Sequence, residues 1–311
     1  MAATNSLGII ILNYETWNET YECILSILRH PSKCGFLIYV VDNHSMNRPN
    51  DNIMSLIQKK QNIILINSDE NNGYAAGNNI GIKKAIEDNC KYIMIVNNDV
   101  EFCDECIDKL ILAIDMDVNV GIVGPKVYNE DMDMQNYIYV DSLLKEEYLC
   151  RTKLRYFFPK LCNKYYGIDS VNSTKNVVVV IPQGCCFLMS RECALKVTPL
   201  DEHTFLYMEE FILAKRMLSN NMKILLVPSA IAIHKCGKSS INVRAFAYTC
   251  FVCSEIYYCR SYCRANILTI LPLYIIRSVA YVLKTIYDKN YRKYLWIFLK
   301  RTLYELFIIK N

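Results

Sequence analysis

The segment YIMIVNNDVEF, Tyr92–Phe102, decides the fold prediction. Its first five residues, Tyr92–Val96, suit a buried strand, and they lead directly into Asn97, Asn98 and Asp99. Open parallel sheets bind ligands beyond the carboxyl ends of their strands. A cluster of side-chain oxygens in this place therefore indicates a ligand site, provided that the rest of the chain builds such a sheet.

The first 125 residues alternate between apolar runs and segments with helical spacing. The runs that favour strands are Leu7–Leu12, Phe36–Val41, Ile63–Ile66, Tyr92–Val96 and Val120–Val123. The segments that favour helices are Trp17–Arg29, Asp51–Lys60, Tyr74–Asp88 and Glu105–Met116. This alternation predicts an α/β fold with a mainly parallel central sheet flanked by helices.

The rest of the chain is less regular, and Val127–Asn176 shows no clear period. Strands are expected at Val177–Ile181, Cys185–Met189, Lys223–Val227 and Ala230–His234, and a helix at Glu209–Asn220. The residues after Val243 are expected to be helical, with an interruption at Pro272. We therefore expect a main domain over residues 1–243 and a C-terminal helical region over residues 244–311.

The charge, hydrophobic content and cysteine content bear on whether the chain is folded, what it binds and whether its thiols are reduced. The net charge of +4 gives no general case for a nucleic-acid partner, and 52% hydrophobic residues exclude global disorder. From Arg244 onward, 11 Lys and Arg stand against 3 Asp and Glu, so a basic C-terminal region follows a mildly acidic body. The 15 cysteines are irregularly spaced and no secretory signal precedes the first strand, which predicts reduced thiols in a cytoplasmic protein.

Zinc binding by the closely spaced cysteines is not expected. The pairs lie in helix-like segments without the turn residues of a zinc knuckle, and they are Cys103 with Cys106, Cys250 with Cys253, and Cys259 with Cys263. We interpret them as small buried hydrophobic residues.

Two further strands of the predicted sheet end in polar residues. These are Asn13, Tyr14 and Glu15 after the first strand, and Asp42 and Asn43 after the second. Any one such cluster is compatible with an ordinary polar loop or a helix cap. Three clusters at one edge of a sheet favour a binding site.

Glycines recur every four residues in NNGYAAGNNIG, at Gly73, Gly77 and Gly81. Small residues at this spacing let a backbone approach a ligand or another element closely, so helix–sheet packing is the alternative to ligand binding. The segment is neither a G-x-G-x-x-G motif nor a P-loop, and dinucleotide or triphosphate binding by those devices is not supported.

The second half offers two more candidates. Glu209 and Glu210 are adjacent carboxylates at the start of a predicted helix, where acidic residues also commonly stabilise the helix dipole. His234 follows a short strand, a place where a lone histidine is often structural. Lys235 and Lys238 would add positive charge beside it.

Seven segments together resemble the family-2 nucleotide-sugar glycosyltransferases, most closely the rhamnosyltransferase-like branch. They follow in the family's order between Leu7 and Ser240, and they are NYETWNETYECILSIL, VVDNHS, NNGYAAGNNIG, VNNDV, GCCFLMSREC, LDEHTFLYMEE and HKCGKS. The resemblance implies a GT-A fold, with residues 1–243 as the catalytic domain.

The resemblance also implies a role for each matching residue. The nucleotide would contact Asn13, Tyr14, Glu15, Asp42 and Asn43, while Gly73, Gly77, Asn78 and Gly184 would lie near the nucleotide and the sugars. The segment Asn97, Asn98, Asp99 matches a D-x-D motif, in which Asp99 would hold Mg²⁺ or Mn²⁺ on the diphosphate with His234 near the metal. Glu210, beside Glu209, matches the general base.

The implied activity is inverting transfer of a sugar from a nucleoside diphosphate donor to a hydroxyl of a growing glycan. A lipid-linked bacterial surface polysaccharide is the expected acceptor. Asn97 and Ile212 stand where the family often has Asp, which keeps a non-catalytic nucleotide-sugar-binding homologue open. A sugar-phosphate nucleotidyltransferase would need a Gly- and Arg-rich loop after the first strand, and NYETWNET offers none.

The C-terminal region is expected to lie on a surface. The apolar run Ala265–Ile276 is shorter than the roughly 20 residues that a membrane-spanning helix needs, and Arg277 ends it. In the last segment, Leu295, Phe298, Leu299, Leu303 and Leu306 share one helical face, with Lys293, Lys300 and Arg301 toward the other. This predicts peripheral contact with the inner face of the cell membrane, with packing on the body or in a homodimer as alternatives.

Overall fold

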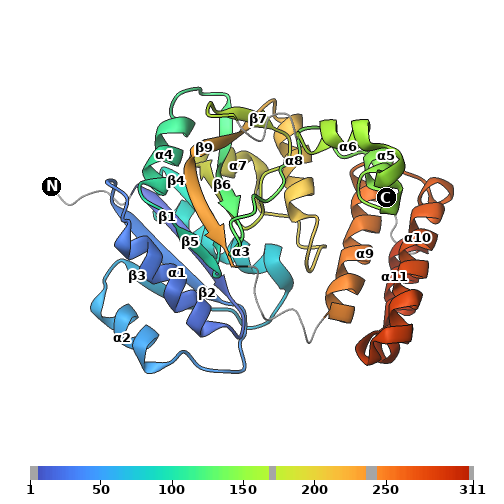
Figure 1. Ribbon diagram of the computed structural model, residues 1–311. Helices are drawn as coiled ribbons and strands as arrows, with labels where there is room; N and C mark the ends of the chain where they lie inside the picture. Colours follow the sequence, from blue (N-terminus) through green and yellow to red (C-terminus); the bar gives the residue numbers. More distant parts are fainter. Residues whose placement is uncertain (1–5, 168–172, 236–243, 308–311) are drawn as a thin grey trace.

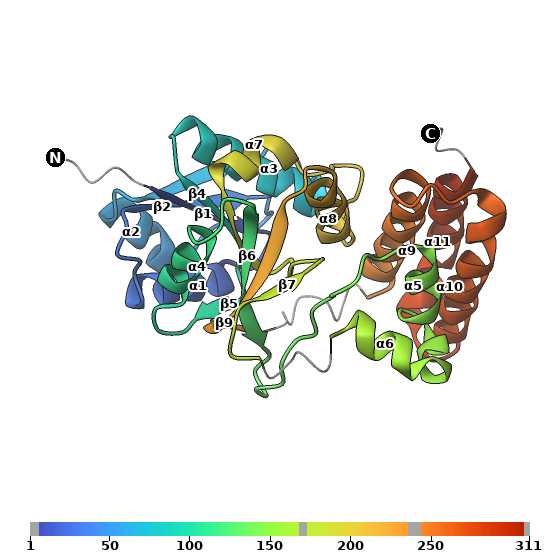
Figure 2. The same ribbon diagram turned by 90° about the horizontal axis from the view of Figure 1, so that it is seen from above.

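The computed structural model describes residues 6–167, 173–235 and 244–307. Within these residues, a central sheet carries helices on both faces, and a group of long helices lies to one side of it (Figure 1). The view from above shows the same separation, with α5 and α6 against the C-terminal helices (Figure 2). The predicted α/β class, with its C-terminal helices, is confirmed.

The sheet follows the order β3-β2-β1-β4-β8-β6-β9-β5, and β7 pairs with β9. Its first four strands are mutually parallel and match the predicted segments: β1 (Leu7–Asn13), β2 (Phe36–Asp42), β3 (Ile63–Asn67) and β4 (Tyr92–Asn97). The residues of β1 and β4 are almost entirely buried because helices cover both faces of the sheet, whereas β3, at the edge of the sheet, is mostly half-buried.

The second half of the sheet is mixed. β8 (Cys186–Ser190) runs antiparallel between β4 and β6 (Val120–Tyr128). The two short strands expected after residue 222 form one strand, β9 (Lys223–His234), which is parallel to β6. β5 (Val100–Phe102) pairs antiparallel with β9, as does β7 (Val177–Val179). β7 lies within the strand expected at Val177–Ile181, whereas β5 was not predicted, because its three residues are too few to show a period.

Two apolar cores lie on the two faces of the sheet. One is covered by α1 (Trp17–Arg29), α2 (Asp51–Lys59) and α4 (Cys106–Ile114). The other is covered by α3 (Gly73–Glu87), α7 (Arg191–Val197) and α8 (Glu209–Ser219). The irregular segment after β6 contains α5 (Leu144–Leu149), the 3-10 helix η1 (Lys153–Phe157) and α6 (Pro159–Tyr165), each too short to give a clear pattern.

A third core joins α8 to the C-terminal helices α9 (Arg244–Ser261), α10 (Ile267–Tyr287) and α11 (Lys289–Phe307). Phe211 of α8 meets Tyr258 of α9 edge-on, and Phe298 of α11 stacks on Tyr281 of α10. The C-terminal helices therefore share apolar contacts with the helix that carries the acidic pair.

Two expectations about α10 are wrong. The helix continues through Pro272, because the carbonyl that proline leaves without a donor belongs to Leu268, in an exposed first turn. It also continues past Arg277, whose guanidinium makes two hydrogen bonds, of 2.8 and 2.6 Å, to the buried carboxylate of Glu255 on α9. With 21 residues, α10 is long and apolar enough to cross a membrane by length and composition.

The inner face of α11 also differs from the prediction. Phe298 and Leu306 are buried as expected, but Tyr291 and Thr302 are buried with them, whereas Leu303 is 40% exposed. The helix packs this face against α9 and α10, within the C-terminal region itself, so packing on the body and packing in a homodimer stay open as alternatives to membrane contact. Lys293, Lys300 and Arg301 remain exposed.

Candidate active site

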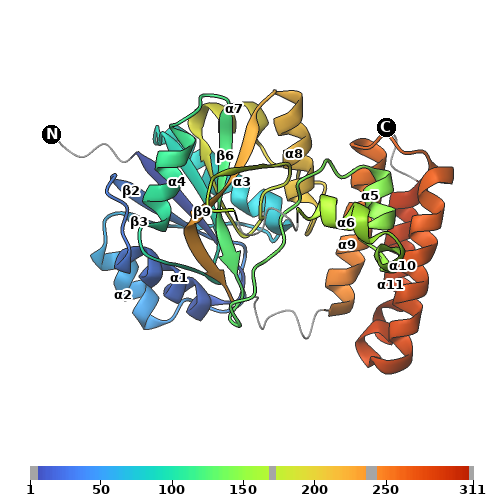
Figure 3. The same cartoon turned by 45° about the horizontal axis from the view of Figure 1, so that its top comes forward.

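The structure brings the three polar strand ends together. In the parallel ladder, Asn13 at the end of β1 lies opposite Asp42 at the end of β2, and Asn97 at the end of β4 lies opposite Leu12. Figure 3 shows this edge of the sheet facing the same side as the N-terminus of α3. Polar groups from four loops therefore border one open region, as the sequence predicts for a site.

Asn13 is completely buried, and its amide is used within the protein. It donates to Oδ1 of Asp42 (3.0 Å) and to Oγ of Ser45 (3.1 Å), and its carbonyl accepts from Oγ1 of Thr20 (2.7 Å). Ser45 also donates to Asp42 (2.5 Å). Two donors thus fix the Asp42 carboxylate, which remains partly exposed at the strand end.

Tyr14 and Glu15 form the rim of this site. The ring of Tyr14 is 47% exposed, which suits it to stack on a planar base. Glu15 has a positive φ of 61° and accepts a hydrogen bond from the backbone of Met46 (2.7 Å). Its carboxylate therefore ties the first loop to the loop after β2.

Two buried asparagines carry amide oxygens without a hydrogen-bond partner among the described residues. Nδ2 of Asn43 donates to Asn71 (2.9 Å) and to the carbonyl of Gly73 (3.2 Å), while Nδ2 of Asn78 donates to Tyr74 (2.9 Å). The Oδ1 atoms of Asn43 and Asn78 are left unpaired. Unpaired buried oxygens are costly, so these two are candidates to accept from a ligand or water.

Gly73 and Gly77 are required by packing. A Cβ on Gly77 would lie 2.4 Å from a methyl of Leu12, and one on Gly81 would lie 2.5 Å from Ile10. The backbone of Gly73 has φ +91°, and a Cβ there would lie 2.2 Å from the carbonyl oxygen of Phe205. Helix–sheet packing, the alternative that the sequence left open, therefore accounts for this spacing.

Replacing Gly73 with alanine should destabilise the fold by more than about 1 kcal/mol, because both the left-handed φ and the contact with Phe205 disfavour a side chain. Thermal or urea unfolding measures the change. The matched control is Gly124→Ala, since a Cβ there would have only one neighbour, at 3.7 Å. Equal stability of both variants would contradict the packing role.

Asp99 and His234 meet because β5 pairs with β9. Val100 lies opposite His234 in the ladder, and Oδ1 of Asp99 lies 3.2 Å from Nε2 of the imidazole. The other ring nitrogen lies 3.0 Å from Nε2 of Gln135. Burial lowers the pKa of His234, but hydrogen bonds to Asp99 and Cys185 outweigh it and raise the pKa to about 11.

The middle residue of the D-x-D match has a structural role. Nδ2 of Asn98 donates to Oγ1 of Thr16 (2.7 Å) and to Oγ1 of Thr20 (2.9 Å), which holds the loop against α1. Lys235 forms an ion pair with Glu101 (2.9 Å). Lys238 and the rest of HKCGKS after Lys235 lie outside the described residues.

Asp99 and His234 lie close enough together to hold a divalent metal. A carboxylate oxygen and an imidazole nitrogen, here 3.2 Å apart, are both possible ligands of Mn²⁺. Because the pKa of His234 is raised, its imidazole would have to release a proton in order to bind such an ion. In the described residues, no group of three or more His, Cys, Asp and Glu side chains is placed to enclose a metal.

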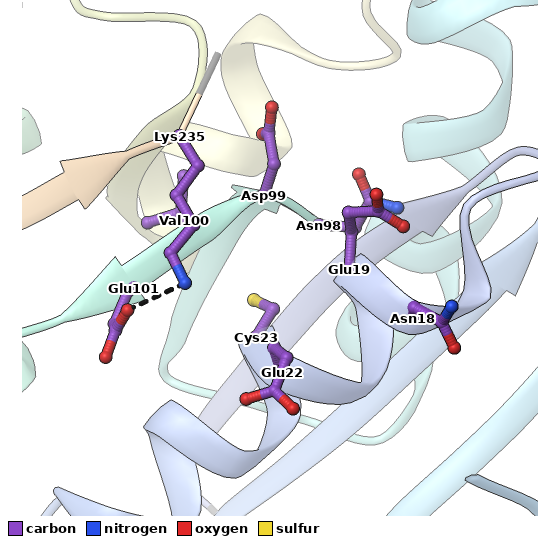
Figure 4. A pocket seen from close by; sticks show the side chains of 9 residues that line it. All are labelled: Asn18, Glu19, Glu22, Cys23, Asn98, Asp99, Val100, Glu101 and Lys235. Atoms are coloured by element: carbon purple, nitrogen blue, oxygen red, sulfur yellow. Dashed lines mark ion pairs between the residues drawn. The ribbon is translucent and has the colours of Figure 1, made fainter. Parts of the chain in front are cut away.

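A cavity of about 180 Å³ lies beside Asp99, between α1 and β5. Its wall includes Glu19, Glu22 and Cys23, and in Figure 4 the carboxylate of Asp99 points away from these three side chains. The volume is below the range of about 300–1,000 Å³ for small-molecule pockets. The open strand edge, rather than this cavity, is the place for a larger ligand.

The two carboxylates at the start of α8 differ in how much of each side chain is exposed. Glu209 is 6% exposed, and burial together with the charge of Glu210 raises its pKa well above the usual value. Glu210 is partly exposed, and its Oε2 lies 3.6 Å from the Cβ position of Gly184. Burial raises the pKa of Glu210 as well, while its own backbone N–H and the charge of Arg151 oppose that shift.

One turn connects the two halves of the site. The carbonyl of Gly184 accepts from the hydroxyl of Tyr74 (2.6 Å), and the carbonyl of the next residue, Cys185, accepts from the backbone of Asn97 (2.8 Å). The same turn therefore contacts the D-x-D match on one side and Glu210 on the other.

Several residues of the site had not been predicted. Tyr74 and Ser45 belong to quoted motifs, and only their contacts reveal their roles. Arg151 gave no signal because it lies in the irregular segment. Its guanidinium lies over the ring of Phe211 (4.2 Å) and donates to Glu147 (3.0 Å), beside the acidic pair.

Comparison with known proteins gives a family and related folds. The sequence model described as Glycosyl transferase family 2 matches residues 8–195. The low-salt glycan biosynthesis hexosyltransferase Agl10 of Haloferax volcanii is 26% identical over 231 residues, which cover 74% of this chain and 67% of that protein.

Two solved structures share the fold. GalNAc-T7 with UDP, GalNAc and Mn²⁺ has a TM-score of 0.56 at 15% identity, over 74% of this chain. S. aureus TarS 1-349 has a TM-score of 0.51 at 12% identity, over 81% of this chain. The match covers 43% of the GalNAc-T7 chain and 65% of the TarS chain, so each of these proteins contains a part that has no counterpart in the match.

Proposed function

The chain belongs to glycosyl transferase family 2, and on that premise we propose that it is an inverting enzyme that transfers a sugar from a nucleoside diphosphate to a hydroxyl group of a glycan. The observation that carries this proposal is the turn at Gly184 and Cys185. In this turn, the Cβ position of Gly184 lies 3.6 Å from Oε2 of Glu210, and the carbonyl of Cys185 accepts a hydrogen bond from the backbone of Asn97 (2.8 Å) at the end of β4. A proton acceptor and a site for the leaving diphosphate are both needed for a single displacement.

On the acceptor side of the reaction, Glu210 would act as the general base. An acceptor hydroxyl is a weak nucleophile, and a carboxylate within hydrogen-bond reach takes its proton as the new bond to the sugar forms. Direct attack by the acceptor hydroxyl, with Glu210 as the base and the diphosphate as the leaving group, inverts the configuration at the sugar. Glu209 is 6% exposed, so it is the less accessible carboxylate of the pair.

The donor side belongs to the strand ends. The departing diphosphate gains negative charge, and a bound divalent ion, Mg²⁺ or Mn²⁺, would neutralise that charge. Asp99 and His234 would hold this ion, and Tyr14 with Asp42 would bind the nucleoside. The presence of UDP and Mn²⁺ in the structure of GalNAc-T7 supports a donor and a metal of this kind.

We propose a lipid-linked surface glycan as the acceptor, assembled on the cytoplasmic side of a bacterial membrane. The name of the hexosyltransferase Agl10, which refers to glycan biosynthesis, supports a glycan acceptor. The basic C-terminal helices support a place near lipid.

The test measures release of nucleoside diphosphate from a panel of sugar nucleotides with Mn²⁺. Ligands are first selected by thermal shift, because a ligand that binds the folded state raises its apparent stability. The proposal predicts slow release without acceptor and faster release with a glycan. Binding without any release, under every acceptor condition, would instead support a non-catalytic sugar-nucleotide-binding homologue, for which Asn97 in place of Asp is the argument.

Replacing Asp42 with alanine should weaken binding of the free nucleotide and of the sugar nucleotide by a similar factor of about ten. The reason is that the carboxylate of Asp42, which Asn13 positions, is proposed to accept hydrogen bonds from the nucleoside and not from the sugar that is transferred. Calorimetric titration of both ligands measures the change. The matched control is Glu87→Ala, which removes a negative charge at the other end of the sheet. Weakening of the sugar nucleotide alone would place Asp42 near the sugar.

A further inference from the structure

The helix α10 is apolar on two opposite sides. Its inner side packs on α9 and α11 through Ile270, Leu273, Tyr274 and Tyr281. On the other side, six large apolar residues follow each other at helical spacing with exposed fractions between 47% and 80%: Leu268, Ile275, Val279, Val282, Leu283 and Ile286. We call these six residues the outer face of α10.

The outer face is long and continuous. From Leu268 to Ile286 it extends over about 27 Å at the 1.5 Å rise of an α-helix. Isolated exposed apolar residues are ordinary, but a continuous apolar stripe marks a surface that another apolar phase covers. Two exposed aromatic side chains, Tyr287 (87%) and Trp296 (76%), lie on the same pair of helices, and such side chains favour the boundary between water and lipid.

The charges around the outer face have one sign. The exposed basic residues that flank α10 or lie on α11 include Arg264, Lys289, Arg292, Lys293 and Lys300, whereas Lys284 and Arg301 lie over the rings of Tyr248 and Phe246 on α9. The acidic residues between Arg264 and Phe307 are Asp288 and Glu305. Oε2 of Glu305 lies 3.3 Å from Nε2 of His203. A second copy of the chain, bound through this same face about a two-fold axis, would place cations against cations. An anionic lipid surface complements them.

The orientation of α10 follows from its inner side. Arg277, at mid-helix, makes its two hydrogen bonds to Glu255 of α9. The hydroxyl of Tyr148 on α5 accepts from the backbone of Leu273 (2.9 Å) and donates to the carbonyl of Thr269 (2.5 Å). A helix that crossed the bilayer would have to leave these partners and take the Arg277 charge into hydrocarbon, which is expensive.

From these observations we propose that α10 lies in the plane of an anionic membrane, with its outer face among the acyl chains and the surrounding cations at the lipid phosphates. Helices of this kind bury their apolar face to a depth of about 5–10 Å. The inference depends on neither the donor nor the acceptor proposed above.

The experiment uses the full-length protein and two kinds of vesicle, phosphatidylcholine alone and phosphatidylcholine with phosphatidylglycerol. The outer-face variant combines Ile275→Gln, Val279→Gln and Leu283→Gln. The matched control combines Leu112→Gln, Met116→Gln and Leu195→Gln, which have similar exposure on or beside α4 and α7. Circular dichroism and melting temperature verify that both variants are folded.

We expect the wild type and the control to sediment with the anionic vesicles, and the outer-face variant to bind at least tenfold more weakly. Binding should fall with added salt, and alkaline carbonate should release the protein from the lipid. Equal binding by the outer-face variant overturns the proposal, and retention after carbonate overturns the in-plane orientation. Light scattering tests whether a second copy of the chain covers the outer face instead. If the wild type is a dimer that does not bind lipid, and the outer-face substitutions dissociate it, the face is a dimer interface and the proposal is overturned.

Discussion

Replacing Glu210 with glutamine should lower turnover by about 10²-fold or more, while donor affinity stays close to the wild-type value. Glutamine keeps the size and polarity of the side chain but does not accept the proton of the acceptor hydroxyl. The carboxylate lies beside Gly184, with Oε2 3.6 Å from the Cβ position of that glycine, and Glu210 is partly exposed. Steady-state turnover and donor titration, measured on the same preparation, separate loss of the base from loss of binding.

The matched control is Glu209→Gln, one residue away on the same helix turn. Adjacent helical residues point about 100° apart, so only one of the pair can face the sugar. Glu209 is the more buried of the two carboxylates, with 6% of its surface exposed, so glutamine should replace it with less effect on turnover than at Glu210. If Glu209→Gln loses activity and Glu210→Gln keeps it, the two roles are exchanged. If both variants stay active, the general-base hypothesis for this pair fails.

Replacing Asp99 with asparagine should abolish the dependence of donor binding on Mn²⁺. The variant retains the shape of the residue but loses the carboxylate oxygen that lies 3.2 Å from His234. The two neighbouring side chains, Asn97 and Asn98, are neutral, and the Asp99 carboxylate points away from Glu19 and Glu22 in the wall of the adjacent cavity. We expect at least a hundredfold weaker binding of a nucleoside diphosphate in the presence of Mn²⁺ by calorimetry, with circular dichroism to verify that the variant is folded.

Glu101→Gln is the control for this experiment, because Glu101 lies on the same strand, β5, and pairs with Lys235. It removes the same charge within a few residues of Asp99 and should leave the Mn²⁺ dependence intact. Undiminished binding by Asp99→Asn would remove the metal assignment.

The sequence was sufficient for the elements that depend on local pattern. β1, β2 and β4 are continuous apolar runs, and parallel pairing of such runs necessarily places Asn13, Asp42 and Asn97 at one edge. The strand β5 could not be predicted, because three residues show no period and the pairing with β9 alone defines it. Yet β5 is the element that brings Asp99 to His234.

Distant partners explain the other differences. Arg277 ends an apolar run in the sequence, but Glu255, 22 residues earlier, neutralises it, so the helix continues. The sequence placed two adjacent carboxylates at a helix start, and the resemblance favoured Glu210 as the base. In the structure, Glu209 is the more buried of the two, with 6% of its surface exposed. Gly73 and Gly77 stay candidates for contact with nucleotide, and tertiary structure adds their packing neighbours, Phe205 and Leu12.

The core shared by α8 and the C-terminal helices has a consequence for synthesis of the protein. Phe211, next to Glu210, is completed by Tyr258 of α9, and α9 is held in turn by α11. The ribosome makes α11 after α8 and after the strand ends that we propose to bind nucleotide, and N-terminal parts of a chain generally fold first. We therefore expect a nascent chain to bind nucleotide before it can transfer sugar. The C-terminal helices, which include the one proposed to bind lipid, also complete the packing around α8, the helix that carries Glu210. Sugar transfer would therefore begin only after the membrane-binding part of the chain has been made.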